Sequence, residues 1–386
     1  MKLPVGWRKI KLKDCGKWLG GATPSKDKAS FWNGDIPWAS SQDIKSRTLK
    51  STTYSITVEG LNNSSSNLIP VNSLLMVTRS GILRHTFPVS KTLFPVAINQ
   101  DIKALIPHIE FSTDYIQALL SVDNVNILKL CSKVGTTVES IEYDALRSYL
   151  LLFPPLSEQQ RIAEFLGTWD EAIEKLERLV EAKEKRLDGL VQTLLANTKK
   201  HWSVFRLGEL FRERAETNCP SLELLAITRD RGVIRRSELD KVDSSSEDKS
   251  KYRRIYPDDI GYNTMRMWQG VCGVSHSEGI VSPAYTILIP EKNVNATFSE
   301  FYFKAPHVID VFKRHSQGLV DDTLNLKYHH FAKIKLPFPE LAKQIEIAEI
   351  LSTAQSELRL LKKELAALQR QKRGLMQKLL TGIWRV

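Results

Sequence analysis

At 386 residues the chain is too long for one compact domain, and its apolar content of 42% is typical of globular proteins. It contains no run of 18 apolar residues and no apolar leader at its start, so we expect neither a membrane-spanning helix nor a signal peptide. The 4 cysteines form no CxxC pair, which argues against a zinc site and fits a reducing cytoplasm. A net charge of +11 favours a polyanionic partner.

The first segment, residues 1–155, mixes short apolar runs with turn residues. The pattern predicts strands at residues 74–77 and 104–106 and a short helix at residues 114–120. Pro154 and Pro155 end this segment. We therefore expect a mixed α/β domain here.

A long helix is predicted for the second segment, residues 156–198, ending at about Asn197. Ser157 and Gln160 have the spacing of a capping box at its start. Apolar residues then alternate three and four apart, as in the seam of a coiled coil. The seam positions are Ile162, Leu166, Trp169, Ile173, Leu176, Val180, Lys183, Leu187, Leu190 and Leu194.

The remaining chain repeats this arrangement, with a second mixed domain at 199–338 and a second helix at 339–386. Residues 156–195 align without a gap to residues 341–380, at an offset of 185. Each seam contains one lysine, Lys183 in the first helix and Lys372 in the second, and these breaks favour one register. The sequence thus predicts an α+β protein of two pseudo-repeated domains and two paired helices, a design suited to a bipartite target.

No catalytic motif was found. The sequence lacks a phosphate-binding loop and a dinucleotide fingerprint. Glu181-Ala182-Lys183 has the Glu-x-Lys form of many nucleases but lies within the predicted helix, and His329-His330 has no evident metal-binding partners. We expect a binding protein without a metal site and not an enzyme by itself.

Several motifs, in order, resemble the specificity subunit of type I restriction-modification systems. The resemblance is carried by residues 21–25 (GATPS), 31–38 (FWNGDIPW), 43–44 (DI), 79–81 (RSG) and 97–100 (AINQ), then 154–159 (PPLSEQ), 263–266 (NTMR), 282–285 (SPAY) and 379–382 (LLTG). The second helix departs from the first, with Ala342-Lys343 in place of Ser157-Glu158.

This resemblance implies two target recognition domains, each reading half of a split double-stranded DNA site, joined by two antiparallel coiled-coil helices that act as a ruler. Two methyltransferase subunits that modify adenine and two motor-nuclease subunits that cleave unmodified DNA would be the partners. The chain itself would need no cofactor. S-adenosylmethionine, ATP and magnesium would belong to those partners, all in the cytoplasm.

Side chains with planar or multiple donors near predicted strand ends are our candidate DNA contacts, because such groups suit base edges and phosphates. Eleven arginines between residues 201 and 340 add to this expectation. The candidates are Ser41, Lys45, Arg79, Arg84, Asn99, Gln100, Arg229, Arg231, Asn263, Arg266, Gln269 and Tyr285.

Apolar residues outside the seams are our candidate partner contacts, with packing on the adjacent domains as the alternative. They are Phe165, Leu179, Val191, Leu195, Ile350, Met376 and Leu380. Two other functions stay open at this point: a coiled-coil adaptor whose end domains bind protein, and a recognition subunit of a methylation-only system.

Overall fold

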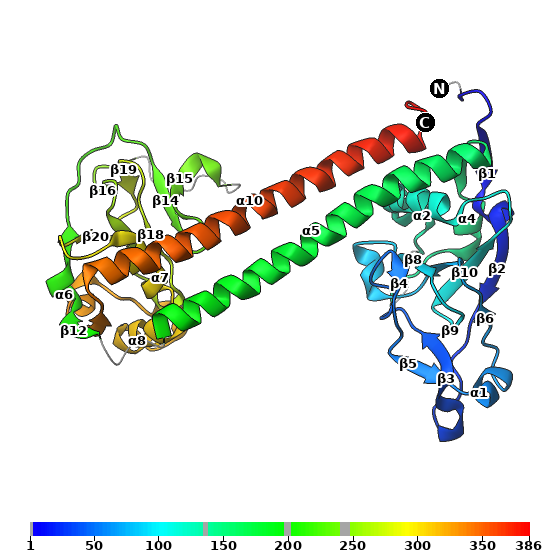
Figure 1. The fold of residues 1–386 in the computed structure, drawn as a ribbon, viewed down its shortest axis with the longest axis horizontal. Coiled ribbons are helices and arrows are strands. Elements are labelled where there is room, and N and C mark those ends of the chain that lie inside the picture. The colour runs from blue at the N-terminus through cyan, green and yellow to red at the C-terminus, as the bar shows by residue number, and fades with distance from the viewer. Residues whose placement is uncertain (1–2, 134–137, 197–201, 240–247) are drawn as a thin grey trace. The chain divides into compact units, whose positions relative to one another are not determined.

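The computed structural model describes residues 3–133, 138–196, 202–239 and 248–386, and divides into two compact units (Figure 1). The first unit comprises residues 1–176 and 364–386, and the second comprises residues 177–363. Each unit contains part of both long helices, α5 (Leu156–Ala196) and α10 (Leu341–Leu380). The predicted end of the first helix at Asn197 lies outside the described residues.

The described part of the first unit contains three sheets. A two-stranded ladder pairs β1 with β11, a five-stranded sheet has the order β2-β10-β7-β8-β4, and a four-stranded sheet has the order β5-β3-β9-β6. Their strands are β1 (Arg8–Lys11), β2 (Gly16–Gly20), β3 (Trp32–Ala39), β4 (Thr48–Leu49), β5 (Tyr54–Ile56), β6 (Leu68–Ile69), β7 (Leu74–Val77), β8 (Val89–Thr92), β9 (Val96–Ile98), β10 (Ile102–Pro107) and β11 (Leu150–Phe153). The short helices are α1 (Val58–Asn62), α2 (Thr113–Val122), α3 (Asn124–Cys131) and α4 (Tyr143–Ser148).

Apolar strand sequences explain the position of the first core. All four residues of β7 are buried, and β10 lies beside it in an antiparallel ladder that places Ala104 opposite Leu75. Helix α2 packs on this sheet with Tyr115, Ile116 and Leu120 fully buried. The predicted strands at residues 74–77 and 104–106 and the helix at 114–120 are therefore confirmed, with α2 slightly longer than expected.

The second unit repeats the plan with different strand lengths. It pairs β12 with β21, β14 with β15 and β16 with β19, and it has a four-stranded sheet of order β13-β20-β17-β18. The strands are β12 (Ser203–Arg206), β13 (Phe211–Arg214), β14 (Leu225–Thr228), β15 (Gly232–Arg235), β16 (Arg253–Ile255), β17 (Ile260–Asn263), β18 (Cys272–Val274), β19 (Gly279–Val281), β20 (Tyr285–Pro290) and β21 (Lys335–Phe338). The helices are α6 (Leu207–Leu210), α7 (Ala296–Phe303), α8 (Pro306–His315) and α9 (Tyr328–Phe331). Stacked and edge-to-face aromatic rings, including Phe211, Phe303 and Phe331, fill its core.

The predicted seam positions of both long helices are buried or half-buried, and none is exposed. Ile162 and Leu166 of α5 are buried in the first core, and Ile347 and Leu351 of α10 are buried in the second. Each seam lysine meets a carboxylate on the opposite helix: Lys372 pairs with Asp170 in the first unit, and Lys183 pairs with Glu357 in the second. The first core contains the start of α5 and the end of α10, and the second core contains the end of α5 and the start of α10, so the two helices are antiparallel.

Both long helices begin with the same buried glutamine. Gln159 Nε2 donates to the carbonyl of Pro154 at 2.9 Å, and Gln344 Nε2 donates to that of Pro339 at 2.8 Å. The predicted capping box was wrong, because α5 begins at Leu156 and Ser157 therefore lies inside the first turn. The Gln159 side chain does not cap the helix amides; it joins the first turn of α5 to the preceding segment instead.

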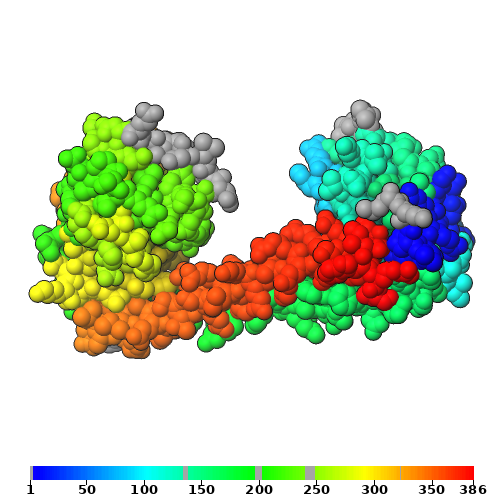
Figure 2. Space-filling model, turned by 90° about the horizontal axis from the view of Figure 1, so that it is seen from above, coloured from blue at the N-terminus to red at the C-terminus, as the bar shows by residue number. Residues whose placement is uncertain are grey.

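The C-terminal residues pack against the start of the chain within the first unit, where Figure 2 shows the red and blue ends in contact. The Arg385 guanidinium donates to the carbonyl of Val5 at 3.2 Å and pairs with the buried Glu158 at 2.7 Å. Gly382 has φ +74°, which favours glycine, and lies so close to Pro4 that a Cβ atom would meet its ring at 2.6 Å.

The predicted fold class is confirmed: two mixed α/β repeats with two long antiparallel helices. Among the described helices, none is long and apolar enough to cross a membrane.

Candidate nucleic-acid interface

Three loops of the first domain meet at one edge of its sheets. Strands β3 and β9 are parallel, so their carboxyl ends lie together, and the amide of Asn99 donates to the carbonyl of Ala39 at 3.0 Å. The amide of Thr78, just after β7, donates to the carbonyl of Asp101 at 2.7 Å. We call this set of loops, residues 40–47, 78–85 and 99–101, the first-domain edge.

The first-domain edge brings together all six first-domain candidates. Lys45 and Arg79 are exposed, and within the described part of the chain neither has an ion-pair partner. Ser41 is half-buried, and Gln100 is exposed with its Oε1 accepting a 2.8 Å hydrogen bond from Thr23. This bond leaves the Gln100 NH2 group to donate, and such a group can donate to adenine N7 or to a phosphate oxygen.

Two candidates on this edge are already engaged. Asn99 is 5% exposed, and its side chain bonds Asp101 twice, at 3.1 Å each. Arg84, at the end of a short turn (Gly81–Arg84), is paired with Glu139. Their observed role is to shape the loops, which makes them weaker candidates for base contact than Lys45 and Arg79.

In the second domain, the candidates gather where β17 ends and β20 begins. Asn263 is the register partner of Tyr285, and the following Thr264 bonds the carbonyl of Ala284 through its amide at 3.1 Å. Arg266 is exposed, and Gln269 is half-buried in the next turn (Met267–Gln269). Burial raises the pKa of Tyr285, so its hydroxyl stays protonated and can donate.

The hairpin of β14 and β15 places Arg229 and Arg231 at its tip. Arg229 is exposed, and within the described residues it has no ion-pair partner. Arg231 is paired with Glu238. Of the two, Arg229 is the arginine whose charge is left over for an anionic ligand.

The arginine content of the second domain overstated its free positive charge. Within the described residues, acidic side chains of the same unit pair with at least six of the eleven arginines. Arg254, for example, pairs with both Glu216 and Glu278, and its guanidinium lies 4.5 Å from the ring centre of Tyr256. The count of arginines alone was therefore a poor guide to DNA contacts, because sequence does not show which acids lie beside them.

The candidate partner contacts on the long helices divide into two groups. Phe165, Leu179 and Ile350 are exposed, at 41%, 42% and 38%. The assignment was wrong for Leu195, Met376 and Leu380, which are 0%, 7% and 2% exposed and belong to the apolar cores of the two units. Val191 packs against the second core. These residues lie on the helix faces that pack on the adjacent domains.

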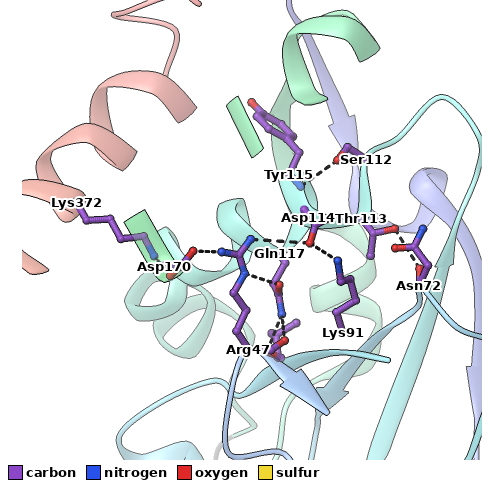
Figure 3. Close-up of polar contacts among 11 residues, drawn as sticks. Arg47, Asn72, Lys91, Ser112, Thr113, Asp114, Tyr115, Gln117, Asp170 and Lys372 are labelled. Atoms are coloured by element: carbon purple, nitrogen blue, oxygen red, sulfur yellow. Dashed lines mark hydrogen bonds and ion pairs between the residues drawn. The ribbon is translucent and has the colours of Figure 1, made fainter. Parts of the chain in front are cut away.

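A polar cluster that the sequence did not reveal surrounds Arg47, the last residue of the 40–47 loop (Figure 3). The Arg47 side chain donates to Gln117 Oε1 at 2.9 Å and pairs with Asp170 of α5, which also pairs with Lys372 of α10. Burial and the neighbouring Arg47 lower the pKa of Lys372 to about 8. Among the described residues, no group of three His, Cys, Asp or Glu side chains could hold a metal ion.

The fold and these edges agree with one protein family. The type I restriction modification DNA specificity domain family matches residues 4–184 and again residues 199–370. The chain belongs to this family. The resemblance seen in the motifs is thus confirmed for both repeats, and the chain is a specificity subunit in the sense of that family.

Named relatives agree. The chain is 39% identical over 189 residues to the EcoR124I/EcoR124II specificity subunit of Escherichia coli, covering 48% of this chain and 46% of that protein. It is 25% identical over 244 residues to the MjaIX specificity subunit of Methanocaldococcus jannaschii, covering 58% and 56%. The matches thus span about half the length of these relatives.

Solved structures show the same fold. An S subunit of a type I restriction-modification system from M. genitalium aligns with a TM-score of 0.63 and 17% identity, covering 98% of both chains. A structure described for complex assembly and conformational transition of the type I R-M system aligns with a TM-score of 0.56 and 18% identity, covering 98% of this chain and 99% of the other.

Proposed function

We propose that this chain reads a bipartite double-stranded DNA sequence, one half with each domain, as the specificity subunit of a type I restriction-modification complex. The observation that carries the proposal is the double family match combined with two unlike sets of donors. The first domain offers Lys45, Arg79 and Gln100, while the second offers Arg229 and the Asn263–Gln269 segment. Different donors in the same fold suit different base sequences.

Catalysis belongs to other subunits in this proposal. The chain would work with two methyltransferase subunits, which methylate adenine with S-adenosylmethionine, and two motor-nuclease subunits, which use ATP and magnesium to cleave unmodified DNA in the cytoplasm. The exposed Phe165, Leu179 and Ile350 are the remaining candidates for subunit contact. A methylation-only complex without the motor subunits is a variant of the same proposal.

Binding of DNA by the chain is the first test. Filter binding of the purified full chain to random double-stranded DNA across a salt series should give a steep negative slope, because phosphate contacts release counterions. Absence of DNA binding at low salt would favour the second candidate, a coiled-coil adaptor that binds protein.

Sequence reading in the cell is the second test. The adenine methylome of the host should contain a split motif that disappears when the gene for this chain is deleted. Restriction of unmodified phage DNA should be lost in the same strain if motor subunits take part. A methylome unchanged by the deletion would contradict the proposal.

A further inference from the structure

The loop between β3 and β4 carries two candidate DNA contacts, Ser41 and Lys45, and its position has to be fixed for either to read DNA. A cavity of about 410 Å³ lies beside this loop, lined by Lys45 and Arg47 and by Leu166 and Met376 of the long helices. Ile44 anchors the loop in the core of its own domain, being only 2% exposed. On the side of the cavity, apolar packing against the long helices is incomplete, so polar contacts have to join the loop to them.

Arg47 supplies those contacts at the end of the loop. Gln117 Nε2 donates to its carbonyl at 2.6 Å, and the amide of Lys91 donates to the same carbonyl at 2.8 Å. The Arg47 guanidinium extends the other way, to Asp170, and lies 3.9 Å from Asp114 (Figure 3). One residue thus holds the loop to its own domain by its backbone and to helix α5 by its side chain.

Asp170 is the point where three parts of the chain meet. Its carboxylate pairs with Arg47 from the loop and with Lys372 from α10, and the side chains of Arg47 and Asp170 are 31% and 30% exposed. One turn further along α5, Lys50 pairs with Glu174 at 2.6 Å, but these side chains are 59% and 46% exposed. The two pairs join the same segments and differ mainly in their exposure to water.

We propose that Asp170 is a positioning residue for DNA reading: through Arg47 it fixes the Ser40–Arg47 loop of the first-domain edge to the α5–α10 pair. The inference rests on the proposed function, since it concerns how one domain presents its contacts. A partly buried charge pair holds its geometry better than an exposed one, because solvent screens it less. Lys372 holds the same carboxylate in place from the other helix.

The long helices do not repeat the charged residues of this arrangement. At the offset of 185 residues, Asp170 corresponds to Gln355, Glu174 to Arg359 and Lys372 to Leu187. The joint therefore serves the first domain alone. Its loss should affect one half of the recognised site and spare the other, which a general folding defect would not do.

The test uses the full chain and a library of duplexes with a random core. Selection with the unaltered chain gives a preferred duplex, and versions with either half scrambled give the discrimination at each half. Asp170→Asn and Arg47→Met should each reduce discrimination at the same single half by about 10-fold, as expected for breaking a partly buried charge pair. Asp170→Glu should restore most of it, and Glu174→Gln is the matched exposed control with an expected change below about 2-fold.

Each outcome decides a separate question. If the unaltered chain selects no sequence, the proposed function fails. If it does, and Asp170→Asn behaves like Glu174→Gln or weakens both halves equally, the positioning role is wrong. Arg47→Met leaves the Asp170–Lys372 pair between the helices intact, so it tests the loop even if Asp170→Asn fails to fold.

Discussion

The first turns of the two long helices share the same buried glutamine contacts but carry different charged residues. Gln159 and Gln344, related by the repeat, each make the same three bonds. Their Oε1 atoms accept from the backbone amides of Ser112 at 3.0 Å and Asn295 at 2.8 Å, and their amide groups donate to two carbonyls each. Ser112 and Asn295 in turn cap helices α2 and α7. One buried amide thus joins a long helix to its domain in both units.

Charged contacts follow no such rule. In the first unit Glu158 is buried and pairs with Arg385, whereas the equivalent position in the second unit is Lys343, which pairs with Glu346 on its own helix. The seam lysines also differ, since Lys372 pairs with Asp170 and Lys183 with Glu357. Losing a buried glutamine would leave buried amides and carbonyls without partners, which is costly, so both repeats keep the residue. Charged residues can be exchanged between the repeats as long as each keeps a partner.

The shared glutamines give the largest expected effect. Replacing Gln159 or Gln344 by Met removes a buried partner from one amide and two carbonyls, so each change should lower the free energy of unfolding by about 2–4 kcal/mol. Denaturant unfolding followed by tryptophan fluorescence measures this loss. Gln192→Met, at an exposed position of α5, is the matched control and should change little.

Equality of the two losses is the critical point of that experiment. If the two glutamines have the same structural role, the decreases in the free energy of unfolding for Gln159→Met and Gln344→Met should agree within about 1 kcal/mol, the usual uncertainty of such comparisons. A large loss at one position and none at the other would mean that only one of the two long helices is joined to its domain in this way.

Sequence reasoning found what depends on periodicity and missed what depends on distant pairing. The helix seam was readable because Ile162, Leu166 and their repeats are close in sequence and share one face. The partners of Arg47 are 70 and 123 residues away, and the repeat gives no hint of them, because Asp170 corresponds to Gln355. The cluster could not be derived from pattern alone.

The candidate site shows the same limit. Residues near strand ends did gather at the first-domain edge, as expected from the parallel pairing of β3 and β9. The burial of Asn99 was not predictable, because it follows from the two-residue pairing of these strands and from the bonds to Asp101. Exposure of Leu195 was wrongly expected for a similar reason: its neighbours come from the second domain, not from the helix.

The two domains are expected to read different halves of the DNA site, although the long helices that join them are alike. Substitution of one arginine in each domain tests this. Arg79→Ala and Arg229→Ala should each reduce discrimination at one half of the selected DNA site, and at opposite halves, by about 1–3 kcal/mol if they read bases. Arg254→Ala, whose charge is taken by Glu216 and Glu278, is the control and should leave DNA binding unchanged. Equal weakening of specific and random DNA would identify the two arginines as phosphate contacts only.

The smallest expected effect concerns the seam lysines and depends on pH. The pKa of Lys372 is lowered to about 8, below its ordinary value of 10.5, because burial and Arg47 disfavour its charge. Between these two values the unfolded chain binds more protons than the folded one, so stability should rise as pH increases from 8 toward 10.5. Lys372→Met should remove this rise and, after allowance for solvent screening, increase the free energy of unfolding at pH 7 by about 1 kcal/mol. Asp170 keeps Arg47 as a partner in that variant, so no carboxylate is left alone.

Lys183→Met, at the seam position of the second unit, is the comparison, because it leaves Glu357 without its partner on α5 and should give no gain in stability. Equal stabilisation by both substitutions would show that the two seam lysines have the same effect on stability. The two units would then differ in charge only at Glu158 and Lys343.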